Sequence, residues 1–140
     1  MLLHVPLSVG EVLDKVTILE IKSERIDDAA KLKNINNELA QLRALLTDAV
    51  FDEASIKSLV DELKQINETL WDIEDNIRDQ EMAGTFGDRF IELARAVYVT
   101  NDKRAMIKKK LNEATGSTLV EEKSYKDYSG ASSNARALRS

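Results

Sequence analysis

Cysteine is absent from the 140 residues, and the chain has only one proline, five glycines and 5% aromatic residues. Without cysteine there can be no disulfide, no thiolate metal site and no cysteine nucleophile. The scarcity of proline, glycine and aromatic side chains, together with 32% charged residues, favours helices over sheet. A chain of this length can bury one core, so we predict an all-α fold with a single helical domain over residues 1–128.

Further absences disfavour several classes of partner. No stretch approaches the roughly 18 consecutive apolar residues of a membrane span, and residues 1–11 lack the charged start of a signal peptide. The formal net charge of −5 disfavours nucleic acid. We therefore expect a cytoplasmic protein with no membrane span and no nucleic-acid partner.

Signatures of catalysis and of metal binding are also missing. His4 is the only histidine, so the chain can build neither a nucleophile–histidine–acid set nor a histidine metal site. Gly84 and Gly87 lack the preceding strand and the following lysine of a phosphate-binding loop. We therefore expect no metal and no cofactor, and the sequence pattern identifies no catalytic residue. Whether the protein is an enzyme stays open.

Residues 8–26 form the most informative stretch of the chain. Ser8 and Glu11 have the spacing of a capping box, which predicts a helix over residues 9–27. One face of that helix is apolar, whereas the other is charged but carries Ile18 in its middle. A face turned to solvent would not place isoleucine among its charges. We therefore expect both faces to contact protein, which leaves acids and bases partly buried and in need of partners.

Three more helices are predicted, over residues 29–47, 53–82 (capped by Asp52) and 88–114. The third helix carries apolar residues in heptad register: Ile56, Leu59, Leu63, Ile66, Leu70, Ile73 and Ile77. Heptads predict coiled-coil-like packing, and short connections favour antiparallel neighbours. We predict an antiparallel bundle of four helices with a long hairpin formed by the third and fourth. Trp71 lies off the seam and could cover a bundle edge or a second subunit, so a homodimer is an alternative.

Both ends of the chain are predicted to be extended. Residues 2–7 read as an arm that packs its leucines on the bundle, and residues 117–128 read as a segment that docks through Leu119, Val120 and Tyr125. Residues 129–140 are small and polar without hydrophobic periodicity, which predicts a disordered tail.

Three motifs combine charged and apolar residues at helical or extended spacing. They are GExxDKxxILxIKxERI at residues 10–26, NDxRxxIKxxxN at residues 101–112 and EEKSY at residues 121–125. Together they resemble a bacterial family of short helical proteins of unknown function. A similar module is present in some tetratricopeptide-repeat and glycan-biosynthesis proteins. The resemblance covers the arm, the first helix and residues 97–128. It implies that the three motifs lie together in space, and it suggests a link to surface-polysaccharide metabolism.

The charges of the three motifs have two interpretations. In the first they form an internal network whose acids are Glu11, Asp14, Asp102 and Glu121. Lys22 and Arg25 would then meet an acid of the second or third motif, and Arg104 and Lys108 an acid of the first. In the second interpretation the motifs line a pocket for an anionic phosphate or carboxylate, since arginine binds such groups bidentately. Its candidate ligand-binding residues are Lys15, Lys22, Arg25, Asn101, Arg104, Lys108 and Tyr125.

These observations favour a binding or scaffolding module that presents a helical surface to a partner protein. The alternative is a small helical enzyme or binder that acts on an anionic metabolite by electrostatic stabilisation.

Overall fold

The computed structural model describes residues 1–129, and all regular secondary structure in these residues is helical. Four α-helices and one 3₁₀-helix follow one another: α1 (Val9–Arg25), α2 (Ala29–Arg43), η1 (Ala49–Asp52), α3 (Ala54–Ala83) and α4 (Asp88–Thr115). The predicted all-α fold is confirmed. No helix of the described part is long and apolar enough to cross a membrane.

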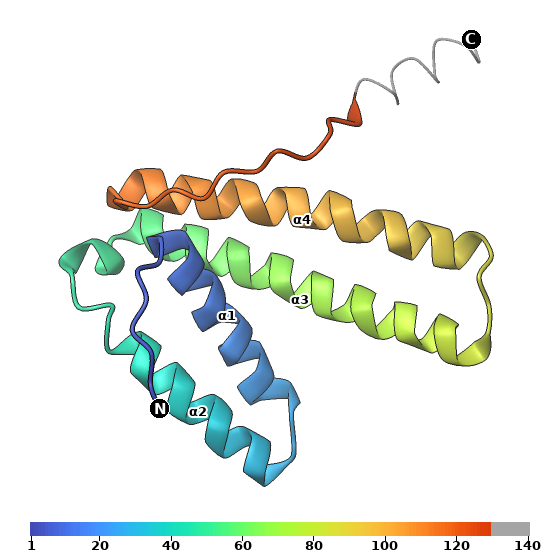
Figure 1. Cartoon of the computed structure of the whole chain (residues 1–140), viewed down its shortest axis with the longest axis horizontal. Coiled ribbons are helices and arrows are strands. Elements are labelled where there is room, and N and C mark those ends of the chain that lie inside the picture. Colours follow the sequence, from blue (N-terminus) through green and yellow to red (C-terminus); the bar gives the residue numbers. More distant parts are fainter. Residues whose placement is uncertain (130–140) are drawn as a thin grey trace.

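The two longest helices, α3 and α4, form the predicted antiparallel hairpin. Helix α1 lies against one half of it, and α2 lies beside α1 (Figure 1). Helix α1 packs against α2, α3 and α4, whereas the principal contacts of α2 are with α1 alone. The other half of the hairpin projects beyond the α1–α2 pair (Figure 1). We call residues 68–95 the projecting half.

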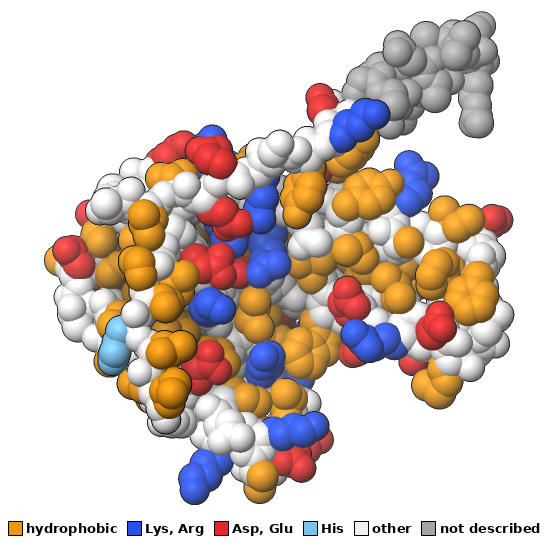
Figure 2. Space-filling view, in the orientation of Figure 1, with side chains coloured by type: hydrophobic (Ala, Val, Ile, Leu, Met, Phe, Trp, Pro, Cys, Tyr) orange, Lys and Arg blue, Asp and Glu red, His pale blue; other side chains and the backbone are white. Residues whose placement is uncertain are grey.

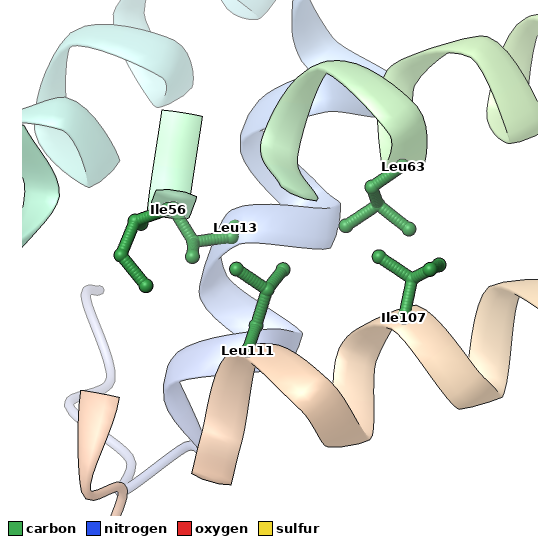
Figure 3. Close-up of a cluster of buried hydrophobic side chains, with 5 residues drawn as sticks. All are labelled: Leu13, Ile56, Leu63, Ile107 and Leu111. Atoms are coloured by element: carbon green, nitrogen blue, oxygen red, sulfur yellow. The ribbon is translucent and has the colours of Figure 1, made fainter. Parts of the chain in front are cut away.

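The main core lies where α1 crosses the α3–α4 hairpin. Its buried side chains are Leu13, Ile56, Leu63, Ile107 and Leu111, which converge from three helices (Figure 3). A second buried cluster joins α1 to α2 through Val16, Leu19, Ile35 and Leu39. Both clusters use the apolar face of α1. Asp14 and Ile21, on and beside its charged face, are also buried, so both faces contact protein as predicted.

Local signals set most helix ends. Ser8 accepts a hydrogen bond from the backbone N–H of Glu11, and Gly84 and Gly116 end α3 and α4 in the left-handed conformation, each with φ of 66°. Helix α2 ends at Arg43 and not at residue 47 as predicted. Asp48 instead caps the short η1 helix by accepting from the N–H of Val50, so the chain turns before α3. Asp52, the predicted cap of α3, lies inside η1.

The predicted packing of the two chain ends is wrong. In the N-terminal arm Leu2, Leu3 and Val5 are 66%, 75% and 65% exposed, because no helix covers them. In the C-terminal segment Leu119 and Tyr125 are also largely exposed, and polar contacts hold the segment instead. The predicted tail lies outside the described residues, apart from Ser129.

Candidate functional site

The N-terminus of α1 is fixed against the C-terminal part of α4. Gly10 allows this approach, since a Cβ at this position would lie 2.5 Å from the backbone oxygen of Lys108. The N–H of Gly10 donates to Oδ1 of Asn112 over 2.6 Å, and the N–H of Val9 donates to Oγ of Ser117 over 3.1 Å. Together with Ser8 these side chains satisfy the first free N–H groups of α1. The contact brings the acids of the first motif to the bases of the second.

Asp14 is the centre of a buried polar group between α1, α3 and α4. Its side chain is 1% exposed and accepts two hydrogen bonds from Arg104, one of them from Nε to Oδ1 over 2.9 Å. Asn67 donates from Nδ2 to Oδ1 of Asp14 over 2.9 Å and to Oγ1 of Thr17 over 3.0 Å. The hydrogen bond to Asp14 raises the pKa of Arg104 despite burial of the guanidinium. Arg104 is therefore held as a cation by a bidentate pair.

Lys108 lies one helical turn from Arg104 and joins α1 to the C-terminal segment. Its Nζ donates to Glu11 over 2.6 Å and to Glu121 over 3.0 Å, and its side chain is 11% exposed. Burial lowers the pKa of the Lys108 amine, but the hydrogen bonds to the two acids outweigh it and raise that pKa. Hydrogen bonds from Lys123 and Lys108 lower the pKa of Glu121 from 4.5 to about 2. The segment is thus attached to α4 through an ionised carboxylate between two ammonium groups.

A cleft of about 920 Å³ opens between α4 and the C-terminal segment, and we call it the outer cleft. Its lining includes four cations, two acids and three tyrosines: Arg104, Lys108, Lys123 and Lys126, Asp102 and Asp127, and Tyr98, Tyr125 and Tyr128. The Tyr128 hydroxyl donates to Asp102 over 2.7 Å, and its ring meets that of Tyr98 edge-on with centroids 5.1 Å apart. Figure 2 shows Lys and Arg side chains beside acidic ones where the segment passes over the helices. The lining therefore combines three tyrosine rings with an excess of cations over acids.

A second, smaller cleft of about 350 Å³ lies where α1 meets the start of the projecting half, and we call it the elbow cleft. Its apolar lining, which we call its floor, consists of Ile18, Ile21, Leu70, Trp71 and Val97. Its polar and charged lining consists of Asn67, Glu74, Asp75, Asn101 and Arg104. Arg104 and Asn101 line both clefts. The elbow cleft explains why an isoleucine, Ile18, lies among the charges of α1.

The model of a family of unknown function (DUF6165) matches residues 3–138. The chain belongs to this family. No curated protein and no solved structure matches the chain. Because the match spans nearly the whole chain, it includes all three motifs and both clefts.

Among the predicted ligand-binding residues of this DUF6165 protein, those of the second and third motifs come together. Asn101, Arg104, Lys108 and Tyr125 all line the outer cleft. The two pairings expected for Arg104 and Lys108, with acids of the first motif, are present.

The predicted partners of Lys22 and Arg25 are wrong. Arg25 pairs with Asp72 of α3 over 2.6 Å and lies over the Trp71 ring at 5.7 Å. The reason is distance along the helix, since Arg25 lies fourteen residues after Glu11 and therefore about 21 Å away. Within residues 1–129, Lys15 and Lys22 make no ion pair.

Asp102, assigned to the charge network from the sequence, accepts from the Tyr128 hydroxyl and pairs with no cation of the described residues. Sequence reasoning also missed Asn67, which lies at a polar position between heptads of α3, and Lys123 and Lys126 in the outer cleft. Asn67 directly follows the seam residue Ile66, at a position outside the apolar heptad series where polar residues are ordinary, so the sequence gives no signal for it. Nothing in the sequence distinguishes Lys126 from a surface lysine.

Proposed function

We propose that this DUF6165 protein is a binding module and that the outer cleft is its binding site. The ligand class is a small anionic molecule rich in hydroxyl groups, such as a sugar phosphate or a sugar carboxylate. The observation that carries the proposal is the set of uncommitted donors that open on one cleft beside tyrosine rings. A cleft of about 920 Å³ lies within the size range of small-molecule sites.

The N–H groups that are free to bind a ligand are those that donate no hydrogen bond within residues 1–129. Arg104 uses Nε and Nη2 for Asp14, which leaves Nη1 without a partner among residues 1–129. Lys108 uses two of its three N–H groups, and the Asn101 amide uses none within the same residues. These groups can donate to phosphate, carboxylate or hydroxyl oxygens of a ligand. Since both cations have a raised pKa, they keep their charge at neutral pH.

Binding fits the geometry better than catalysis does. The Tyr128 hydroxyl is the one phenol of the outer cleft that contacts a carboxylate, and its hydrogen bond to Asp102 raises its pKa. A phenol that is harder to ionise is a poorer nucleophile and a poorer base at neutral pH. The ligand class also agrees with the link to surface-polysaccharide metabolism, which stays part of the proposal.

The test compares glucose 6-phosphate and glucuronate with neutral glucose by thermal denaturation and calorimetric titration. The two anionic sugars should raise the melting temperature by mass action, and glucose should not. Asn101→Ala and Lys126→Gln should each weaken binding about 10-fold, as loss of a hydrogen bond to a charged group does. Lys110→Gln is the matched control, because Lys110 is exposed on the same helix and outside the cleft. A melting temperature that neither anionic sugar changes would remove the proposal.

A second candidate function, docking of a basic protein partner, is supported by the charge of the projecting half. Residues 68–95 contain eight acidic and three basic residues, so they carry a net charge of −5 and the rest of the chain is neutral. Met82, Phe86 and Ile91 are exposed there by 83%, 55% and 53%. Such a surface suits a basic amphipathic helix that supplies both charge and apolar anchors.

This candidate is tested with a synthetic helix of leucine and lysine and with its leucine–glutamate counterpart. The lysine peptide should bind, more weakly in higher salt, and Phe86→Ser with Ile91→Ser should reduce its affinity. Equal binding of both peptides, or no effect of the two substitutions, would exclude the projecting half as the docking surface.

A further inference from the structure

The elbow cleft contains a buried acceptor without a donor. Asn67 is 6% exposed, and its Nδ2 is fully used by Asp14 and Thr17. Its Oδ1 accepts no hydrogen bond within residues 1–129. Every side-chain oxygen in that part that is sealed from solvent does have a hydrogen-bond partner. Oδ1 must therefore open to solvent, and the elbow cleft is the opening that Asn67 lines. The cleft thus offers the Oδ1 acceptor of Asn67 beside apolar side chains, and the charged side chains of Glu74, Asp75 and Arg104 also line it.

The rest of the elbow cleft defines what could fill it. Ile18, Leu70, Trp71 and Val97 supply apolar surface, and a volume of about 350 Å³ holds a few side chains but not a helix. An extended apolar peptide matches both features, because its side chains suit the floor and its backbone N–H can donate to Oδ1 of Asn67.

The chain itself carries such a peptide, namely the N-terminal arm of residues 1–7. Pro6 favours an extended conformation of the preceding residue. Leu2, Leu3 and Val5 of the arm are all at least 65% exposed, and the arm has no acidic, lysine or arginine side chain. Its apolar groups are therefore uncovered in one copy of the chain, and Ile18, Leu70 and Trp71 of the elbow cleft are only partly buried.

The arm of the same copy does not occupy its own elbow cleft. Figure 1 shows that it leaves the start of α1 on the α2 side, away from the projecting half. A second copy can supply the arm, and each copy has one arm and one cleft. If two copies exchange arms, each arm fills the cleft of the other copy, and the assembly is complete as a dimer with no cleft left unfilled.

We propose that two copies of this protein form a dimer by exchanging N-terminal arms, each of which lies in the partner's elbow cleft. The inference does not depend on the proposed ligand of the outer cleft. Trp71, the single tryptophan of the chain, reports on it directly, because an occupied elbow cleft excludes water from the indole.

The first experiment measures molar mass by light scattering at about 100 μM, together with Trp71 emission on dilution. A mass of twice 15.7 kDa is expected, with a red shift of Trp71 emission as dilution dissociates the dimer. Replacing Leu3 and Val5 by serine should yield a monomer with red-shifted emission at the same concentration. Leu45→Ser is the matched control, since Leu45 is also 63% exposed but lies outside both clefts. A monomeric parent, or a dimer that survives loss of Leu3 and Val5, would overturn the proposal.

The second experiment mixes two defective variants. The arm variant, with Leu3→Ser and Val5→Ser, keeps an intact cleft, and the cleft variant, Ile18→Gln, keeps an intact arm. Each alone should be monomeric, and the mixture should form a heterodimer that rests on one arm in one cleft. A dimeric Ile18→Gln protein would show that the arm docks elsewhere and would overturn the proposal.

The third experiment keeps the test valid if Ile18→Gln fails to fold. Because the chain has no cysteine, Val5→Cys and Asn101→Cys proteins can be mixed under mild oxidation. A disulfide between the two different variants is expected, and a Leu45→Cys protein in place of Val5→Cys should not form it. Equal cross-linking of both cysteines to residue 101 would contradict the placement of the arm.

Discussion

The α3–α4 hairpin has two halves that are built differently although the same two helices run through both. The half under α1 contains the main buried cluster and a charge pair that is bidentate, between Asp14 and Arg104. The projecting half has a narrow seam between its two helices, exposed apolar side chains and the whole net charge of the chain. Figure 2 shows the surface hollowed between the two parts.

The comparison shows what one added helix does to a two-helix hairpin. Where α1 covers it, side chains of α3 such as Leu63 are fully buried and ion pairs are removed from water. Where it is uncovered, ion pairs such as Arg78 with Glu74 stay hydrated and contribute little. Stability should therefore come from the covered half, which leaves the projecting half available for contacts with other molecules.

The largest expected difference is between Arg104, which pairs with a buried acid, and Arg25, the last residue of α1, which pairs with an exposed acid of the projecting half. Arg104→Met should cost about 3–5 kcal/mol of unfolding free energy, because it leaves the buried Asp14 carboxylate without its cation. Arg25→Met should cost less than about 1 kcal/mol, since its pair with Asp72 is largely exposed. Urea denaturation of both variants measures the difference. Similar losses for the two arginines would mean that the halves are equally hydrated.

Truncation of an apolar side chain should likewise destabilise the protein more in the covered half than at the elbow cleft. Leu63→Ala should cost about 2–5 kcal/mol, since the side chain is fully buried in the covered half. Leu70→Ala should cost about 1–2 kcal/mol, because Leu70 lines the elbow cleft and already has open space beside it. Thermal unfolding of both variants provides the check. A larger loss of stability for Leu70→Ala than for Leu63→Ala would mean that the residues around the elbow cleft form a closed core.

The approach of α1 to α4 can be tested at Gly10. Gly10→Ala should cost about 1–3 kcal/mol, because the added methyl group would collide with the backbone of Lys108. Gly87→Ala serves as the control in the projecting half. No heavy atom lies within 4 Å of its added Cβ, and the change of helix cap should cost less than about 1 kcal/mol. Equal melting temperatures for the two variants would exclude a tight contact at Gly10.

The smallest effect is the acid response of the C-terminal segment. The pKa of Glu121 is lowered from 4.5 to about 2, so its pairing stabilises the folded state above pH 4.5 and is lost as the pH falls towards 2. Because the side chain is 40% exposed, the segment should be released without unfolding of the helices. The carboxyl chemical shift of Glu121 and amide exchange of residues 119–128 report it. A Glu121→Gln protein should lose this pH response, and an unchanged response would assign it to another acid.

Helix α1 illustrates how far sequence reasoning reaches. The Ser8 cap and the contact of both faces with protein follow from local spacing. The pairing of Arg104 and Lys108 with acids of the first motif is expected because the resemblance implies that the motifs lie together. The partner of Arg25 follows from neither, because Asp72 lies on a helix whose register against α1 is set by packing over the whole hairpin. The arm shows the same limit, since an apolar pattern predicts burial but cannot say which surface provides it.

The sequence by itself determined the helices, their order, most of their ends and the heptad seam of α3, because capping and periodicity act over a few residues. The tertiary structure alone decided that α1 covers only half of the hairpin, that Asn67 meets Asp14, and that two clefts share Arg104. These contacts join residues fifty or more positions apart, as with Asn67 and Asp14 or Arg104 and Asp14. Their geometry depends on where the helices cross, and side-chain packing among all of them sets that crossing.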